Sequence, residues 1–344
     1  MRDYVKFGVV TPFFPFETIL SLCQRVEKLG FDSIWMGDHM VGHWAAMEAL
    51  DAWITLAALS IKTERISLGI VTDVLRRHPA IMAQAAVTLD YLSKGRFILG
   101  IGAGEAMNIV PYGIPFDKPV SRIQEAIQII RRLWSESNIT YEGQFYYLTN
   151  AELRPKPVQQ PSIPIYIAGN SPKTMELTGR HGNGWLPFRL SPTLYTKNLN
   201  HLKGYIKKHG RSDEKIDPCL WLFTGVSEDP KQLNRMREIG KRLILFSPKI
   251  LREFGYEVSP NFDIHRVLIT EATDSAIKTH SKRIPDGIIN EICVIGTPKE
   301  CLERFELYIK AGVRHFVLII LNPLNEVEYA LMTYSKEILP FIKE

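Results

Sequence analysis

The stretch that decides the fold is Gly69–Trp134, with the sequence GIVTDVLRRHPAIMAQAAVTLDYLSKGRFILGIGAGEAMNIVPYGIPFDKPVSRIQEAIQIIRRLW. It contains most of two apolar runs of strand length, 66–72 and 96–102. Each run ends in polar, glycine-bearing sequence, and a helical pattern follows it. Two strand-loop-helix units in succession predict a parallel α/β fold, in which the functional groups lie at the carboxyl ends of the strands.

The same alternation of strand and helix continues on both sides of this stretch. The other runs of strand length are 5–11, 33–36, 165–168, 185–186, 220–226 and 315–320, and residues 141–147 resemble a small hairpin. Eight strands alternating with helices predict a (β/α)₈ TIM barrel. Residues 242–290 mix prolines, charges and short apolar runs, and we interpret them as a helical insertion before the last strand, beside the mouth. No repeat or linker divides the chain, so 1–344 is predicted to be a single domain.

Composition predicts a soluble globular protein rather than a membrane or nucleic-acid-binding protein. The chain has 344 residues, of which 45% are hydrophobic and 23% charged, and no apolar run reaches the ~18 residues of a membrane span. Its N-terminus shows no signal-peptide pattern, which predicts a cytoplasmic protein without membrane insertion. The net charge of +5 is mild and its basic residues are spread out, which argues against nucleic acid. The scattered cysteines have no metal-ligand spacing, so no metal site is predicted.

Asp38 and His39 form the first candidate pair, because they follow the second predicted strand directly. Histidine exchanges protons near neutral pH, and an adjacent carboxylate can orient it. The alternative is a surface aspartate beside a structural histidine. In the next loop, His43 and Trp44 either cover a bound ring or only fill the loop.

The second candidate is the sequence GIGAGEAMN at 100–108. It lacks the GxGxxG spacing that leads directly into a helix in dinucleotide-binding folds, so its glycines are better explained by close approach of the backbone to a flat ring. Glu105 and Asn108 would then face the same mouth, although a helix-capping pair is the alternative. Arg76 and Arg77 could bind an acidic ligand or be ordinary exposed arginines.

A third candidate lies after the fifth strand, where Ser171 and Pro172 are suited to begin a helix as its cap and first residue. The free N–H groups of a helix N-terminus form a natural seat for phosphate.

Several sequence motifs, in the order in which they occur, resemble those of the luciferase-like flavin and deazaflavin superfamily, specifically its branch that uses coenzyme F420. They are WMGDHM, TDVLRRHPAIMAQAAVTL, GRFILGIGAGEAMN, PYGIPFDKPVSR, IPIYIAGNSPK and GTPKECLERFELYIKAGVRHFVL. Within the branch the likeness is closest to phthiodiolone ketoreductases. Secondary-alcohol dehydrogenases, glucose-6-phosphate dehydrogenases and methylenetetrahydromethanopterin reductases are neighbouring groups.

This resemblance implies roles for individual residues. His39, Glu105 and Trp44 would be catalytic, with His39 as the proton relay; Trp44 matches the family position only if one inserted residue is allowed. A cis peptide bond between Gly69 and Ile70 would support the cofactor. The cofactor F420 would be contacted, through its ring or its phosphate, by Asp38, Gly69, Ile70, Thr72, Ala103, Gly104, Asn108, Gly169, Asn170 and Ser171.

The resemblance also implies a reaction, which is hydride transfer between F420 and a ketone or secondary alcohol. Thr11 and Pro12 stand where sugar-phosphate and alcohol members have a glutamate, so a sugar phosphate is disfavoured. The alternatives are reduction of methylenetetrahydromethanopterin and, more remotely, an FMN-dependent monooxygenase or a non-catalytic binding barrel. The family commonly forms dimers, which predicts a homodimer.

Overall fold

The computed structural model describes residues 4–43, 48–213 and 216–343. Within these ranges, eight parallel strands pair side by side and close into a ring, which confirms the predicted barrel. In chain order they are β1 (Lys6–Val10), β2 (Ser33–Gly37), β3 (Ser67–Asp73), β4 (Phe97–Gly102), β7 (Ile165–Ala168), β8 (Gly184–Leu186), β9 (Asp217–Val226) and β11 (His315–Ile320).

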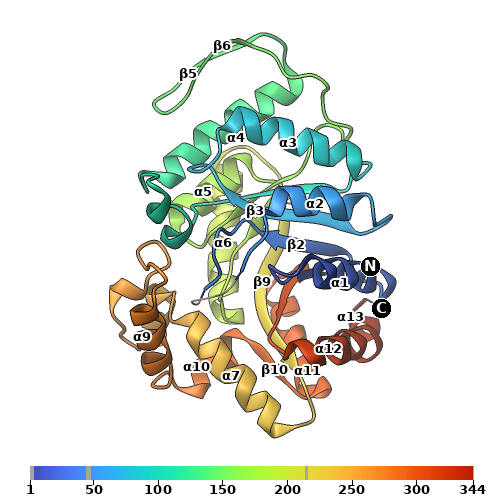
Figure 1. Cartoon of the computed structure of the whole chain (residues 1–344), viewed down its shortest axis with the longest axis vertical. Coiled ribbons are helices and arrows are strands. Elements are labelled where there is room, and N and C mark those ends of the chain that lie inside the picture. Colours follow the sequence, from blue (N-terminus) through green and yellow to red (C-terminus); the bar gives the residue numbers. More distant parts are fainter. Residues whose placement is uncertain (1–3, 44–47, 214–215, 344) are drawn as a thin grey trace.

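Helices surround this ring (Figure 1). They are α1 (Phe16–Lys28), α2 (Ala52–Ser60), α3 (Pro79–Leu92), α4 (Pro119–Ser135), α5 (Pro172–His181), α6 (Pro192–Lys208), α11 (Pro298–Lys310), α12 (Val327–Thr333), the π-helical turn η6 (Tyr334–Ile338) and α13 (Leu339–Lys343). Short 3₁₀ turns are η1 (Ala106–Asn108), η2 (Val110–Tyr112) and η5 (Leu324–Glu326). No helix among the described residues is both long and apolar enough to cross a membrane.

The segment between β9 and β11 is the most irregular part of the fold. It contains α7 (Pro230–Ile244), α8 (Pro248–Glu253), η4 (Pro260–Phe262), α9 (Glu271–Ser281), α10 (Asp286–Ile292) and β10 (Val294–Gly296). The sequence did not predict β10, because this three-residue strand pairs only with the end of β9, outside the closed ring. The predicted hairpin is present as β5 (Ile139–Glu142) and β6 (Tyr147–Ala151), and it extends away from the barrel (Figure 1).

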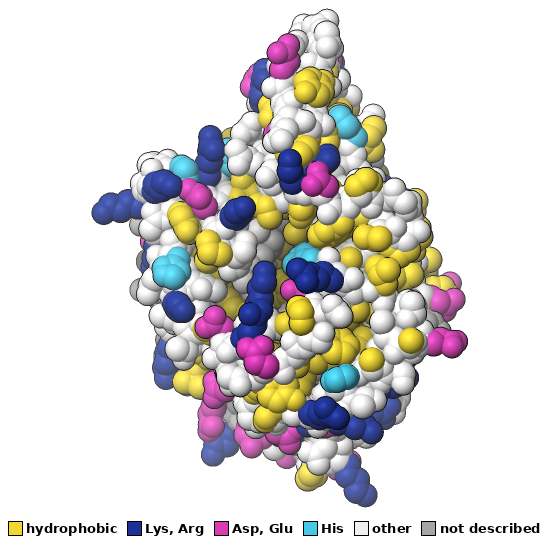
Figure 2. All heavy atoms as spheres, turned by 90° about the vertical axis from the view of Figure 1, so that its left-hand side faces the viewer, with side chains coloured by type: hydrophobic (Ala, Val, Ile, Leu, Met, Phe, Trp, Pro, Cys, Tyr) yellow, Lys and Arg dark blue, Asp and Glu magenta, His cyan; other side chains and the backbone are white. Residues whose placement is uncertain are grey.

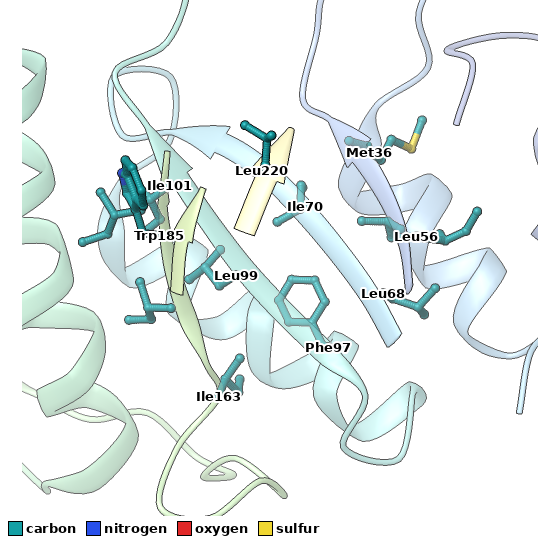
Figure 3. Close-up of a cluster of buried hydrophobic side chains, with 14 of the residues drawn as sticks. Met36, Leu56, Leu68, Ile70, Phe97, Leu99, Ile101, Ile163, Trp185 and Leu220 are labelled. Atoms are coloured by element: carbon teal, nitrogen blue, oxygen red, sulfur yellow. The ribbon is translucent and has the colours of Figure 1, made fainter. Parts of the chain in front are cut away.

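The strands are buried on both faces, as expected for a parallel sheet covered by helices. One large cluster packs strand residues against the helices, and Figure 3 shows Ile70, Leu99 and Leu220 within it. A smaller cluster fills the barrel interior. The rings of Trp35 and Tyr166 lie 5.7 Å apart although their strands, β2 and β7, are not neighbours in the sheet.

The predicted cis bond at Gly69–Ile70 is wrong. The cis peptide bonds among the described residues all precede proline, and Gly69 pairs in regular register with both Trp35 and Ile98. A Cβ atom at Gly69 would lie 2.3 Å from the Trp35 ring. The glycine is therefore explained by close packing of Trp35 inside the barrel, away from the strand end.

A buried ion-pair network joins three strands at the amino end of the barrel, where Lys6, Asp217 and His315 begin β1, β9 and β11. Asp217 accepts hydrogen bonds from Tyr166 (2.7 Å), His315 Nδ1 (3.0 Å) and Lys6 (3.2 Å). Burial raises the pKa of the Asp217 carboxyl, but His315 and Lys6 outweigh it and hold the pKa well below the ordinary value of 3.8. The ionised carboxylate therefore stabilises the folded state.

We expect Asp217→Asn to lower the free energy of unfolding by about 3 kcal/mol, because it leaves buried partners of a charge unpaired. Because the folded-state pKa is depressed, the contribution is fully present above pH ~4 and is lost as the pH falls through the folded-state value. Urea unfolding of wild type and variant between pH 2 and 7 measures this. Asp213→Asn is the control, since Asp213 is exposed and its carboxylate pairs with exposed Lys203. A stability difference that is equal at all pH values would contradict the assignment.

Candidate active site

A cavity with a volume of about 710 Å³ opens at the carboxyl ends of the barrel strands. Seen from the side on which α9 lies, the surface is hollowed, with Lys and Arg side chains around the hollow (Figure 2). The cavity is lined by most of the predicted site residues, namely Asp38, His39, Thr72, Ala103, Gly104, Glu105, Asn108, Gly169, Asn170 and Ser171.

Parallel register is what brings these residues together. Asp73 of β3 pairs with Gly102 of β4, so these two strands end side by side, and Gly37, the last residue of β2, pairs with Val71, two residues before the end of β3. The residues that follow each strand therefore face the same space. Gly69 and Ile70 lie further down β3 and are not among the residues that line the cavity. Trp44 lies outside the described residues.

Asp38 is the centre of a buried network of charges. It accepts a hydrogen bond from the Thr72 hydroxyl (2.7 Å) and pairs with Arg76 (3.2 Å). Arg76 also pairs with Asp73 (2.6 Å). Both carboxylates are almost wholly buried. The Thr72 hydroxyl donates its hydrogen to Asp38, so Thr72 can only accept a hydrogen bond from a bound ligand.

A second cluster joins His39, Glu105, His43 and Asn108. Glu105 lies 3.7 Å from Nδ1 of His39 and 3.6 Å from Nε2 of His43. Asn108 accepts hydrogen bonds from the backbone N–H groups of Met40 and Val41, which orients its side-chain NH₂ toward His39 and Glu105. Asn108 therefore holds the loop after β2 against the turn η1.

His39 is positioned to exchange a proton through Nε2. Nδ1 lies between a donor, the Asn108 side-chain NH₂ at 3.1 Å, and two acceptors, the Val41 carbonyl at 3.2 Å and the Glu105 carboxylate at 3.7 Å. The neutral ring can therefore hold its proton on either nitrogen. Nε2 has no hydrogen-bond partner among the described residues, so it accepts a proton when the ring carries its own proton on Nδ1.

The pKa values of this cluster are shifted in the same direction. Burial lowers the pKa of His39, against the opposing effect of Glu105, so the imidazole is neutral at neutral pH. Burial raises the pKa of Glu105, but the neighbouring His39 and His43 imidazoles and Arg189 outweigh it and leave the pKa at about 2. The cluster therefore combines an ionised carboxylate with a neutral imidazole that can accept a proton.

The same groups could also hold a metal ion. The donor atoms of His39, His43 and Glu105 lie within 4.8 Å of one another, and two imidazoles with one carboxylate are a donor set that Zn²⁺ accepts. This grouping could not be predicted from spacing in the sequence, because His39 and His43 are separated from Glu105 by a whole strand-helix-strand unit.

The N-terminus of α5 forms the predicted anion seat in part. Ser171 caps the helix by accepting from the N–H of Thr174, as expected. The N–H of Gly169 is already used, since it donates to the Leu186 carbonyl. The N–H groups of Asn170, Ser171 and Lys173 donate to no acceptor among the described residues, so they are available to a phosphate.

The sequence missed Arg189, which lines the cavity from the loop after β8. Its position just beyond a strand end is the one signal that could have singled it out. The sequence also left Arg76 and Arg77 open, and here both pair with carboxylates of the protein, Asp38, Asp51 and Asp73.

Comparison with known proteins gives consistent results. The model of the luciferase-like monooxygenase family matches residues 5–315. The F420-dependent glucose-6-phosphate dehydrogenase of Microbacterium testaceum is 30% identical over 340 residues, covering 95% of this chain and 93% of the relative. The phthiodiolone/phenolphthiodiolone dimycocerosates ketoreductase of Mycobacterium bovis is 30% identical over 349 residues, covering 92% of each chain.

Among solved structures, an F420-dependent secondary alcohol dehydrogenase in complex with an F420-acetone adduct superimposes with a TM-score of 0.85. It is 23% identical, and the match covers 99% of this chain and 100% of that one. At this identity the likeness establishes the shared fold.

We expect Glu105→Gln to lower the pKa of His39 below its wild-type value, because the carboxylate favours the protonated imidazole and the amide does not. NMR titration of the ring nitrogens measures the pKa in both proteins. The NMR signals of exposed His201 on α6 serve as an internal control. An unchanged or higher pKa for His39 in the variant would show that Glu105 is not its electrostatic partner.

Proposed function

The chain belongs to the luciferase-like monooxygenase family, and we propose that within it the protein is a coenzyme F420-dependent oxidoreductase. It would transfer hydride between the deazaflavin and a ketone or secondary alcohol. The observation that carries the proposal is the neutral His39 beside ionised Glu105, in the cavity that also presents the free N–H groups of α5.

The cavity suits a cofactor of this kind. A volume of about 710 Å³ lies within the ordinary range for cofactor sites, ~300–1,000 Å³. Gly104 adopts a left-handed φ of 79°, and a Cβ there would meet Ile109 at 2.6 Å, so the backbone turns where a side chain would not fit. The ring would be held by Asp38, Thr72, Ala103, Gly104 and Asn108, and the phosphate by the N–H groups at the start of α5.

When bound, F420 supplies the hydride donor or acceptor. The protein supplies the position of the substrate and the path of the proton. In alcohol oxidation, Nε2 of neutral His39 accepts the hydroxyl proton while hydride leaves the carbon. In ketone reduction, protonated His39 returns that proton to the oxygen. Glu105 stabilises the protonated form of His39 in both directions.

Assembly and cellular location stay predictions from the sequence. We propose a homodimer, because the family commonly forms dimers; the cytoplasmic location predicted from the sequence stays a prediction. Light scattering of the purified protein measures the assembly state.

The first prediction concerns the choice of cofactor. We expect F420 to bind more tightly than FMN, by more than about tenfold, because the motifs from Asp38 to Ser171 follow the F420-using pattern in order. Titration calorimetry of the protein with each cofactor measures the two dissociation constants. Equal or tighter binding of FMN would place the protein with the flavin monooxygenases instead.

The second prediction concerns the proton relay. His39→Asn is expected to lower single-turnover rates by roughly 10²- to 10⁴-fold, the usual contribution of a positioned acid or base, and to leave F420 affinity within a few-fold. His201→Asn, on the outer face of α6, is the matched control and should keep wild-type rates. If the His39 variant loses cofactor affinity and keeps its rate at saturation, His39 shapes the pocket and has no part in proton transfer.

A further inference from the structure

Arg189 is a buried cation held in a fixed position at the cavity wall. Only 5% of the residue is exposed, and its backbone takes a left-handed φ of 59°. The preceding residue, Phe188, is fixed by the Asn170 side chain, which donates to its carbonyl (2.7 Å) and accepts from its N–H (3.2 Å). The loops that follow the neighbouring strands β7 and β8 therefore both fix the position of this guanidinium.

No carboxylate within the described ranges lies within ion-pair distance of Arg189; Glu105 and Asp263 act on its charge from farther away. Among the described residues, the hydrogen bond of its side chain runs from Nη1 to the Ser247 hydroxyl (2.6 Å), and Nε is buried without a partner. The guanidinium lies over the rings of Phe188 (4.9 Å) and Phe223 (5.6 Å). Burial lowers its pKa to about 10, so the group is still charged at neutral pH. A buried charge of this kind is costly unless a counter-ion joins it.

The unpaired guanidinium lies close to the proton-relay cluster. Ser247, its hydrogen-bond partner, directly follows Phe246, whose ring is 5.5 Å from that of His43. The His43 ring is in turn 5.1 Å from that of His39. A small molecule with its carbonyl at His39 would therefore extend toward Arg189 within the same cavity.

We propose that the substrate carries a carboxylate that pairs with Arg189, so that the enzyme acts on an oxo acid or the corresponding hydroxy acid. The inference rests on the proposed function. A singly charged carboxylate balances one guanidinium and can also accept a hydrogen bond from a neighbouring hydroxyl. In the reduction, the ketone carbon gains the hydride and its oxygen gains the proton from His39, while the carboxylate is unchanged.

The experiment compares acids with their methyl esters. With F420H₂ as the reductant, 4-oxopentanoate and 5-oxohexanoate are each assayed beside the ester, and kcat/KM is expected to favour the acid by about 10- to 100-fold, the range for a charged hydrogen bond. Arg189→Met should remove this preference by slowing the acids while leaving the esters within a few-fold. Arg132→Met, an exposed arginine on α4 paired with Glu136, is the matched control and should keep the preference.

Equal use of acid and ester by the wild type would overturn the proposal, as would an equal loss of both in Arg189→Met. A preference for hydroxyketone phosphates over the acids would assign the site to phosphate instead. Weaker F420 binding in the variant with an unchanged preference for acids would assign Arg189 to the cofactor.

A binding measurement separates this proposal from the proposed function. Calorimetry with 4-oxopentanoate and its ester needs no turnover, so acid-selective binding that Arg189→Met abolishes would support the anion site even if F420 were not the cofactor. Absence of acid-selective binding by the wild type overturns the proposal. If the Met variant does not fold, Arg189→Lys and Ser247→Ala replace it, with a partial loss of acid preference expected in each.

Discussion

The site depends on the parallel register of β2, β3 and β4. In a parallel ladder, a shift of one residue between neighbours moves every side chain to the other face. Here the pairing Asp73–Gly102 makes β3 and β4 end level, and the pairing Gly37–Val71 ends β2 within two residues of them. Asp38, Thr72 and the loop from Ala103 to Asn108 become neighbours for that reason alone. The bond from Thr72 to Asp38 and the pairing of Arg76 with Asp38 and Asp73 then tie the strand ends together.

Local patterns were enough to predict the barrel but not its irregular parts. All eight barrel strands are apolar runs that a helical pattern or turn separates, and this information lies within a few residues of each strand. The strand β10 carries no such signal, since its three residues pair only with the end of β9. The failed expectation at Gly69 has a similar cause, because the reason for the glycine is the Trp35 ring on the neighbouring strand.

For the candidate site as well, the positions of the residues could be predicted from the sequence but their charge states could not. Asp38, His39, Glu105 and Ser171 stand at or just beyond strand ends, and a strand end is visible in a sequence. The charge state of each group is not visible there. The pKa of His39 is shifted by burial and by Glu105, which lies 66 positions away in the chain. The Arg189 side chain donates a hydrogen bond to Ser247, which lies 58 positions away. Partners at such separations are fixed by the fold, so their electrostatic consequences follow only once the fold is known.

Some of the charges around the cavity are paired within the protein, whereas others are left for a substrate to pair with. Asp38, Asp73, Arg76 and Arg77 compensate one another, so that corner of the site is nearly neutral before any ligand arrives. Glu105 is partly buried and Arg189 almost wholly buried, and neither has an ion-pair partner of fixed charge within 4 Å among the described residues. Glu105 lies beside the imidazoles of His39 and His43, and a proton taken up by His39 matches its charge during the reaction. Arg189 feels the charges of Glu105 and Asp263 from beyond ion-pair distance, so a substrate anion that enters the cavity is the group that can pair with it directly.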